Sequence, residues 1–246
     1  MRPLSAPELL DVWDRGRDHG PLERALALLV AACPGYPPDA LAALSIGERD
    51  ARLMLLRQWA FGAHAACVAA CPACGAQVEL GFALADVCAA GLAPAAPLLL
   101  EIDGYAVRFR LPTSHDLRDL RGPAGSLGTA AGAGALCAGR HAQGPPTTAA
   151  RLPESVVAAL VAAMAADPLA DIRLGLICPA CGHAWQVLFD IVTFFWSEID
   201  AWARRTLREV HALARAYGWR EAEILALTAR RRRHYLEILA DERLPR

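Results

Sequence analysis

The sequence predicts an α+β fold that is predominantly helical. Hydrophobic residues make up 55 % of the 246-residue chain but aromatic residues only 7 %. The apolar surplus is therefore mainly alanine, leucine and valine, a composition that favours packed helices. Apolar residues recur at helical spacing towards both ends of the chain, and short extended runs lie between these two parts. A chain of this length can bury a core without disulfides, as one large domain or two small ones.

The N-terminal helical region is predicted to span residues 1–70. Apolar positions three or four apart indicate two helices separated by a turn at residues 16–20. A proline-containing break at residues 34–39 precedes a short helix. Ser45, with Glu48 three residues later, has the pattern of a capping box, which predicts a longer helix that runs to about Ala65.

The second region, residues 71–190, is predicted to hold two cysteine motifs and, between them, an inserted β-hairpin, helices and a flexible loop. The hairpin is indicated by two extended runs around Asp103-Gly104, because this dipeptide favours a tight turn. A short helix is expected after Pro112 and a longer one after Pro153. Residues of about 122–150 are rich in glycine, alanine, serine and proline, which predicts a loose surface loop.

The third region, residues 191–246, is predicted to be a long C-terminal helical segment. Apolar residues continue at helical spacing from Thr193 onward, and Gly218 is expected to end that helix in a left-handed cap. A shorter helix follows around Ile224. Thr228 is expected to cap the last helix.

Two identical Cys-Pro-Ala-Cys-Gly pentapeptides form an internal repeat, and each is followed by an extended run. Two cysteines three residues apart on a tight turn place both sulfurs on one ion, and the glycine that follows permits a left-handed turn. Two such turns build a tetrahedral four-thiolate site, which selects zinc or iron, and zinc is favoured where no redox partner is indicated. We therefore expect one structural Zn²⁺ per chain in a zinc-ribbon-like pair of knuckles, with Cys71, Cys74, Cys178 and Cys181 as its ligands.

Other interpretations of the cysteine motifs stay open. In one, the motifs are four reduced cysteines on ordinary turns. In the other, they are redox pairs, although a redox Cys-x-x-Cys normally opens a helix and here an extended run follows. The gap between the pairs is longer than in most zinc ribbons, and an insertion that carries the hairpin and the loop explains it. His183 could replace one thiolate, although four sulfurs already complete the shell.

The sequence predicts no enzymatic activity and no small-molecule substrate. Ser114, His115 and Asp116 are the residue types of a hydrolase triad, but neighbours in sequence point in different directions on a helix. The chain contains no GxSxG, P-loop, GxGxxG or HExxH motif. A zinc hydrolase would need an open coordination position and a general base, and neither is indicated.

The net charge, the first residues and the longest apolar stretch indicate which compartment and which kinds of partner to expect. A formal net charge of −1 argues against a surface built throughout for nucleic acid or anionic membrane. Residues 1–5 are not a charged start that leads into an apolar stretch, as a signal peptide would have, so we expect a cytoplasmic protein with reduced cysteines. The longest apolar stretch, residues 156–166, is shorter than the roughly 20 residues that cross a bilayer, so no membrane partner is expected.

The C-terminal segment carries the candidate surface for a protein partner. By their spacing its aromatic residues are mostly core residues. They nevertheless cover more than one side of a helix, and a wide apolar face needs something to cover it. A run of four arginines beside a metal site also suggests nucleic acid, but acidic residues follow on the same helix and favour a solvated face or an acidic partner. The candidate partner-binding residues are Trp196, Trp202, Trp219, Arg230, Arg231, Arg232, Arg233 and Tyr235.

Several motifs together resemble a known family. They are Leu44-Ser45-Ile46-Gly47-Glu48-Arg49-Asp50, the two cysteine motifs, Leu111-Pro112-Thr113-Ser114, Phe189-Asp190-Ile191, Trp196-Ser197-Glu198-Ile199-Asp200, Glu209-Val210-His211-Ala212-Leu213-Ala214, Tyr217-Gly218-Trp219 and Ile224-Leu225-Ala226-Leu227. With them the chain resembles baseplate-associated proteins of contractile phage tails and phage-tail-like injection systems, which are related to the T-even baseplate hub assembly proteins.

The resemblance implies a non-enzymatic function. The chain would be a baseplate component or a baseplate hub assembly chaperone, would bind baseplate or hub proteins in the cytoplasm, and could be incorporated into the particle. The alternative that the residues leave open is a zinc-ribbon nucleic-acid-binding regulatory protein that uses the four arginines of the last helix.

Overall fold

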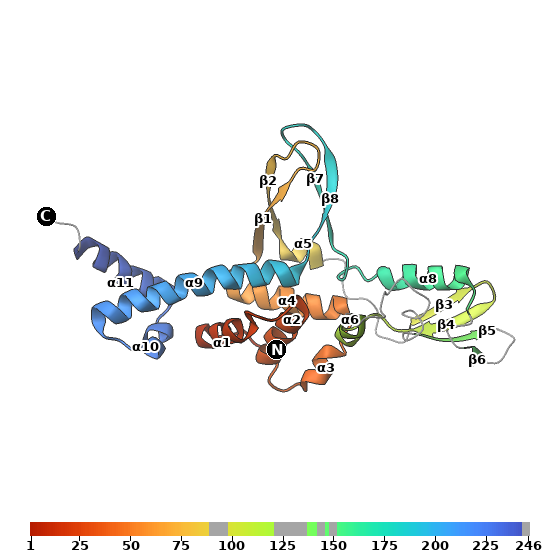
Figure 1. Ribbon diagram of the computed structural model, residues 1–246, viewed down its shortest axis with the longest axis horizontal. Coiled ribbons are helices and arrows are strands. Elements are labelled where there is room, and N and C mark those ends of the chain that lie inside the picture. Colours follow the sequence, from red (N-terminus) through yellow and green to blue (C-terminus); the bar gives the residue numbers. More distant parts are fainter. Residues whose placement is uncertain (89–97, 121–136, 142–145, 148–151, 243–246) are drawn as a thin grey trace.

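The computed structural model describes residues 1–88, 98–120, 137–141, 146–147 and 152–242. It is a mixed structure with a majority of helix and small antiparallel β elements, as the sequence predicts. Figure 1 shows an elongated molecule with three parts: a helical body, a projection made of two hairpins, and a small sheet covered by one helix. Among the described helices, none is long and apolar enough to span a bilayer.

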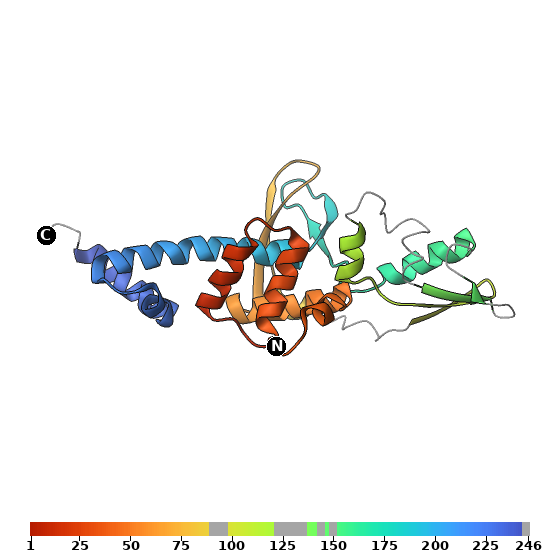
Figure 2. The ribbon, with the colours of Figure 1, turned by 60° about the horizontal axis from the view of Figure 1, so that its bottom comes forward.

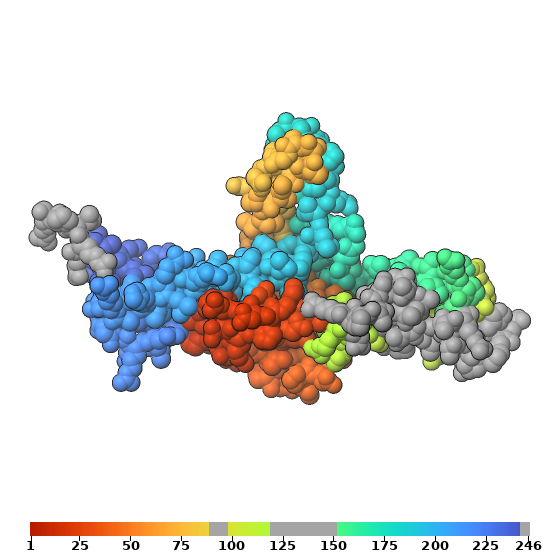
Figure 3. Space-filling view, viewed as in Figure 1, coloured from red at the N-terminus to blue at the C-terminus, as the bar shows by residue number. Residues whose placement is uncertain are grey.

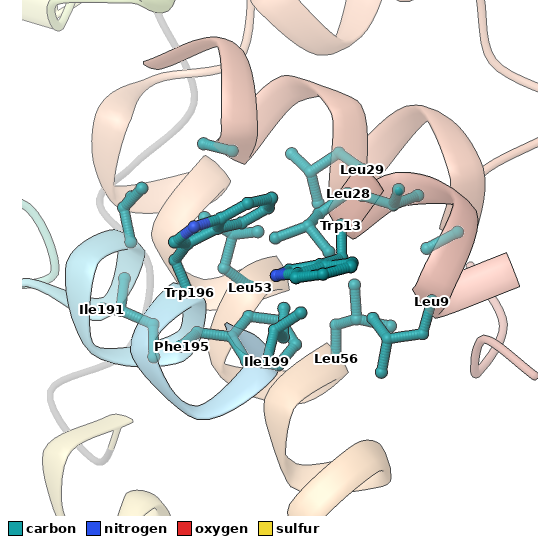
Figure 4. Close-up of a cluster of buried hydrophobic side chains, with 14 of the residues drawn as sticks. Leu9, Trp13, Leu28, Leu29, Leu53, Leu56, Ile191, Phe195, Trp196 and Ile199 are labelled. Atoms are coloured by element: carbon teal, nitrogen blue, oxygen red, sulfur yellow. The ribbon is translucent and has the colours of Figure 1, made fainter. Parts of the chain in front are cut away.

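The helical body combines helices from the two ends of the chain. Its elements are α1 (Ala6–Gly16), α2 (Pro21–Ala32), α3 (Pro38–Ala42), α4 (Ile46–Phe61), α9 (Ile191–Tyr217), α10 (Glu221–Ala226) and α11 (Ala229–Glu242). Helix α9 runs across α1, α2 and α4 (Figures 1 and 2). The largest fully buried side chains at this crossing include Leu28, Leu53, Phe195 and Ile199 (Figure 4). Burial of such side chains stabilises the fold by about 1.5–3 kcal/mol each.

The helix ends follow the local signals in the sequence. The Ser45 hydroxyl accepts a hydrogen bond from the Glu48 N–H (3.1 Å), and the Ser45 N–H donates to the Glu48 carboxylate (3.2 Å), so the predicted capping box is confirmed. Asp190 caps α9 through the N–H of Val192, and Gly218, with φ +69°, ends this helix in the predicted left-handed cap. The Thr228 hydroxyl accepts from a backbone N–H at the start of α11.

The prediction of a helix to about Ala65 is wrong. Helix α4 ends at Phe61, Gly62 takes a positive φ of 97°, and a strand begins at His64. The alanine-rich stretch after Gly62 favours a helix by propensity, but its residues pair with a second strand, and tertiary pairing overrides that preference.

Two antiparallel hairpins connect the cysteine motifs to the body. One joins β1 (His64–Ala70) to β2 (Gln77–Ala83), and the other joins β7 (Arg173–Ile177) to β8 (Ala184–Leu188). The extended runs after each motif, predicted from the sequence, are β2 and β8. The strands before each motif, β1 and β7, were not predicted. The hairpins stand side by side above α9, with the short helix α5 (Leu84–Cys88) at the base of the first (Figure 1).

The third part is a four-stranded antiparallel sheet covered by a helix. It contains β3 (Leu98–Ile102), β4 (Tyr105–Phe109), β5 (Cys137–His141), β6 (Pro146–Thr147) and α8 (Glu154–Ala165). The predicted hairpin is confirmed, because Ile102 pairs with Tyr105 and both turn residues, Asp103 and Gly104, have positive φ. A separate apolar cluster between the sheet and α8 includes Val107, Phe109, Val156, Leu160 and Met164.

The prediction of a loose loop over about 122–150 is wrong for the residues that form β5 and β6. These residues pair with β4 and with each other through backbone hydrogen bonds, which need no large side chains, so their composition did not reveal them. The rest of the predicted loop lies outside the described residues.

The junction between this part and the body is made at the start of α4. The Ile46 N–H donates to the Pro112 carbonyl (2.9 Å), just before the predicted short helix α6 (Ser114–Leu120). The Gly47 N–H donates to the carboxylate of Asp167, which lies beyond α8 (3.2 Å) and is buried. The carboxylate therefore satisfies one of the free N–H groups at the helix start.

Candidate metal centre

The tips of the two hairpins bring the four predicted cysteines together. The sulfurs of Cys71, Cys74, Cys178 and Cys181 all lie within 4.8 Å of one another. The Cys71 and Cys181 sulfurs are 3.7 Å apart, and the Cys74 and Cys178 sulfurs are 3.6 Å apart. Each of these close contacts joins one hairpin to the other.

The backbone of the two knuckles is nearly identical. In the first, the Cys71 N–H donates to the Ala76 carbonyl and the Gly75 N–H donates to the Cys71 carbonyl, both at 2.9 Å. In the second, Cys178, His183 and Gly182 repeat these two bonds at the same distance. The two glycines have φ of +75° and +73°, a conformation that glycine adopts without steric penalty. The repeated pentapeptide therefore builds the same turn twice, and the two turns face each other across the sulfurs.

Two of the sulfur-to-sulfur distances match those of a tetrahedral metal site. Four thiolates at about 2.3 Å from a central zinc lie about 3.8 Å from one another along each edge of the tetrahedron. The two close contacts, at 3.6 and 3.7 Å, match this edge. They are far longer than a disulfide bond of about 2.05 Å, and all four cysteines are free. The donor set of four sulfurs is that of zinc or iron sites.

One side of the cluster is buried and the other faces solvent. Cys71 and Cys178, the first cysteine of each pair, are buried against Val78 and Trp185, whereas the second cysteine of each pair is exposed. With four sulfurs present, the arrangement has no open position for a substrate. It is therefore suited to holding two segments of chain together.

The thiols of the cluster differ in their ease of ionisation. Burial raises the pKa of Cys178, but the N–H groups of Ala180 and Cys181 donate to its sulfur and outweigh burial, so its pKa falls to about 7. The His183 N–H lowers the pKa of Cys181, but the neighbouring thiol of Cys74 and desolvation raise it to about 12. In the absence of a cation the thiols therefore resist becoming four thiolates together, because like charges at this distance repel.

The His183 side chain does not join the ligand set. Its imidazole is exposed and stacks on Trp185, with ring centroids 6.1 Å apart. Only its backbone contributes, through the bonds to the second knuckle.

A buried arginine fixes the first hairpin to the body. Arg57 of α4 donates to the carbonyls of Gly62 and His64, both at 2.8 Å, and its guanidinium binds both carboxylate oxygens of Glu198 on α9. An aromatic contact between Phe82 of the first hairpin and Phe189, which directly follows the second, joins their bases, with ring centroids 5.1 Å apart. The hairpins are thus held together at both the base and the tip.

Two of the predicted partner-binding residues are buried. Trp196 is 8 % exposed, packs in the core and is covered by Arg24, whose Cζ lies 4.6 Å from the ring centroid (Figure 4). Arg232 is 4 % exposed and donates to Glu209 and to the Leu227 carbonyl. Both side chains are used inside the fold and expose little area to a partner.

The other predicted partner-binding residues remain at the surface to different degrees. Trp202, Trp219 and Tyr235 are half-buried, and the rings of Trp219 and Tyr235 pack against each other at 5.0 Å between centroids. The remaining arginines of the run, Arg230, Arg231 and Arg233, are exposed.

The Ser-His-Asp sequence on α6 does not form a relay. Asp116 accepts hydrogen bonds from Arg110 and from both the N–H and the hydroxyl of Thr113, so it caps the helix. His115 is directed to Asp39 of α3, with a 3.4 Å contact to its carbonyl. The Ser114 hydroxyl is buried and has no hydrogen-bond partner among the described residues, so the three side chains do not contact one another, as expected for neighbours on a helix.

Sequence reasoning missed the long-range polar contacts that hold the parts of the fold together. The salt bridge from Arg57 spans 141 residues and the contact from Gly47 to Asp167 spans 120 residues. The available signal was a charged residue at an otherwise apolar helical position, but its partner could not be read from spacing. Comparisons with protein-family models, curated proteins and solved structures return no match, so the class is defined by the site alone: a mixed, mostly helical protein with a four-cysteine cluster fit for a metal ion.

Proposed function

We propose that the four cysteines hold one structural Zn²⁺ in a zinc-ribbon-like arrangement. The observation that carries this is the pair of matching turns that brings four sulfurs within 4.8 Å of one another, with two contacts between the hairpins at the length of a tetrahedral edge. Bound zinc would supply folding free energy, since a structural site of this kind links metal binding to folding. Zinc is preferred to iron because nothing in the donor set requires redox chemistry.

Elemental mass spectrometry of the purified protein tests this proposal. The expected result is one zinc per chain, and Cys74→Ser or Cys181→Ser is expected to lower metal content and solubility together. Cys67→Ser is the matched control, because Cys67 lies on the same hairpin and is half-buried but outside the cluster. Wild-type stability in a metal-free Cys74→Ser protein would contradict a structural role.

We propose further that the chain is a non-enzymatic component or hub assembly chaperone of a contractile-tail baseplate. The support is the resemblance of its motifs, read together with what those motif residues do. Ser45 and Gly47 form the start of α4, Asp190 caps α9, Glu198 holds Arg57, and Gly218 ends α9. The motifs are thus made of residues that fix the fold. A shared fold that presents a shared surface is what an assembly protein needs.

Co-purification with identified subunits tests the baseplate proposal. Affinity purification from the native host, followed by mass spectrometry, is expected to recover baseplate or hub proteins. The alternative, a nucleic-acid-binding regulator, predicts heparin or DNA binding that falls steeply with salt. Recovery of nucleic acid in place of tail proteins would favour that alternative and overturn the baseplate proposal.

A further inference from the structure

A groove on the helical body is lined by arginines, two of which have no acidic partner within the fold. It lies between the α1–α2 turn and the N-terminal half of α9, where these elements pack against one another (Figures 1 and 3). Its volume is about 510 Å³. The charged residues that line it are Arg17, Asp18, Arg24, Asp200 and Arg204.

The guanidinium of Arg24 is held in a fixed orientation. Its Nε donates to the Gly16 carbonyl (3.0 Å), and its Nη2 donates to the Arg17 carbonyl (2.7 Å). Its Cζ also lies 4.6 Å from the ring centroid of the core residue Trp196 (Figure 4). Carbonyl groups do not neutralise its charge, and Nη1 makes no hydrogen bond to any residue that the structure describes. A guanidinium fixed in this way can bind an anion without first losing side-chain freedom.

Arg17 supplies a second unbalanced charge. Its Cζ lies 5.2 Å from the ring centroid of Trp13, and within the described part of the chain it forms no ion pair. Arg204 is different, because its Nε donates to the Asp200 carboxylate (2.8 Å). The other oxygen of that carboxylate accepts from the indole N–H of Trp13 (2.9 Å). Asp200 is therefore engaged within the body, and Arg17 and Arg24 are left for an outside anion.

The charge of the groove favours an anion with a single negative charge. Three arginines and two aspartates line it, so one positive charge is not balanced. A phosphate monoester carries close to two negative charges at neutral pH, and it would be repelled by Asp18 and Asp200. A carboxylate carries one negative charge, and a guanidinium binds it through two parallel hydrogen bonds.

Two hydroxyl groups on α9 favour a carboxylate that belongs to a polypeptide. Thr193 and Ser197 line the groove. Their hydroxyls already donate, to the Asp190 carboxylate and to the Phe194 carbonyl. Each hydroxyl oxygen therefore has only its acceptor positions left, which suit the backbone N–H groups of a peptide.

We propose that this groove binds the carboxylate of an acidic side chain in a partner protein, with Arg17 and Arg24 as the groups that contact it. Charged contacts of this kind contribute to the orientation and rate of association more than to affinity. The chemistry of the groove does not depend on the baseplate function, so either proposal can fail without the other.

NMR titration of the isotope-labelled full-length chain tests the proposal. The probe is the peptide acetyl-Ala-Glu-Ala-amide, and the matched neutral probe is acetyl-Ala-Gln-Ala-amide, which has nearly the same shape. The backbone amide signals of Asp18, Thr193 and Ser197 report on the groove. Saturable shifts are expected with the glutamate peptide, and binding of the glutamine peptide is expected to be about tenfold weaker or less detectable still.

Three variants make the test specific. Arg17→Ala is expected to weaken binding of the glutamate peptide by about fivefold or more, because it removes a charge-assisted contact. Asp18→Asn removes a negative charge from the groove and is expected to tighten binding by about two- to fivefold. Arg208→Ala is the matched control and is expected to change binding by less than about twofold. Arg208 is an exposed arginine of α9 outside the groove, and its Nε donates to the Arg204 carbonyl.

Four results would overturn the proposal. Equal binding of the glutamate and glutamine peptides would show that the groove does not recognise the charge. Tighter binding of inorganic phosphate than of the glutamate peptide, at equal ionic strength, would make it a phosphate site. Equal losses in Arg17→Ala and Arg208→Ala would reduce the effect to general surface charge. Unshifted groove signals with every probe would show that no anion binds there.

Discussion

Arg57 and Glu198 form a bidentate salt bridge between α4 and α9, with nitrogen-to-oxygen distances of 2.8 and 2.6 Å. The guanidinium is almost fully buried, with 3 % of its side chain exposed. It also donates to the two carbonyls at the start of the first hairpin. One side chain thus joins two crossing helices to the base of the first hairpin.

Removal of the Glu198 carboxylate should destabilise the protein strongly. Glu198→Ala leaves a buried guanidinium without its counter-charge, and the expected loss is about 2–4 kcal/mol in the free energy of unfolding. The matched control is Arg204→Ala on the same helix, which breaks an exposed pair with Asp200 and should change stability by less than about 0.5 kcal/mol. Urea denaturation followed by tryptophan fluorescence measures both. Equal losses in the two variants would show that burial of the pair contributes nothing.

Gly47 should not tolerate a side chain. A Cβ at this position would lie 2.2 Å from the Oδ1 of Asp167, which is buried and held by the Leu169 N–H. Gly47→Ala is therefore expected to lower the free energy of unfolding by about 1–3 kcal/mol. Gly35→Ala, where the added atom meets nothing within 4 Å, is the control and should be close to neutral. Thermal melts of both variants decide the matter, and a neutral Gly47→Ala would mean that Asp167 moves aside without loss.

Asp116 should contribute stability that disappears in acid. Partial burial raises the pKa of its carboxyl, but hydrogen bonds from Arg110 and Thr113 outweigh burial and hold the pKa at about 2, against an ordinary value of 3.8. Because the folded-state pKa is the lower one, the contribution is complete above about pH 4 and is lost as the pH falls towards 2.

The measurement is a pH series of unfolding free energies for wild type and Asp116→Asn. The difference between the two proteins should be constant above about pH 4 and shrink between pH 4 and 2. Loss of any bound metal in acid would change the unfolding free energy of both proteins equally, so it cancels in the difference. A difference that stays constant down to pH 2 would contradict the low pKa.

The four arginines of α11 should divide into one structural and three surface residues. Arg232→Ala removes a buried partner of Glu209 and of the Leu227 carbonyl, and it should destabilise the protein by about 2–4 kcal/mol. Arg231→Ala is the exposed neighbour and should leave stability within about 0.5 kcal/mol of wild type. Denaturation curves of the two variants test this. If Arg232→Ala instead reduces only DNA binding, the run belongs to a nucleic-acid surface.

Local signals predicted much of the fold, and distant contacts explain what was missed. Ser45, Gly218 and the Asp103-Gly104 turn act on their own neighbours, so their effects can be read from spacing. Four of the seven residues of strand β1 are alanine, and this composition favours a helix unless a partner strand is known.

The features of the candidate site likewise fall into those that spacing predicts and those that depend on distant contacts. The two cysteine motifs were recognisable because their spacing reflects the chemistry of one ion. The exposure of Ile177 and Leu188 was not recognisable, because alternation along a strand does not tell which side of it is covered. Helical spacing placed Trp196 among the core aromatics, but it did not reveal the close approach of Trp196 to Gly16, where a Cβ would lie 2.3 Å from the indole.

The two cysteine pairs of the metal centre are synthesised at different times, because they are far apart in the sequence. The contacting sulfurs are separated by 104 and 110 residues. A ribosome that adds about 5–20 residues per second needs roughly 5 to 20 s to make the intervening chain. During that interval the first hairpin has emerged without its counterpart, and Cys71 and Cys74 have no second pair to meet. Completion of the metal centre is therefore a late event in synthesis, and the body can acquire its C-terminal helices only after the second hairpin has left the ribosome.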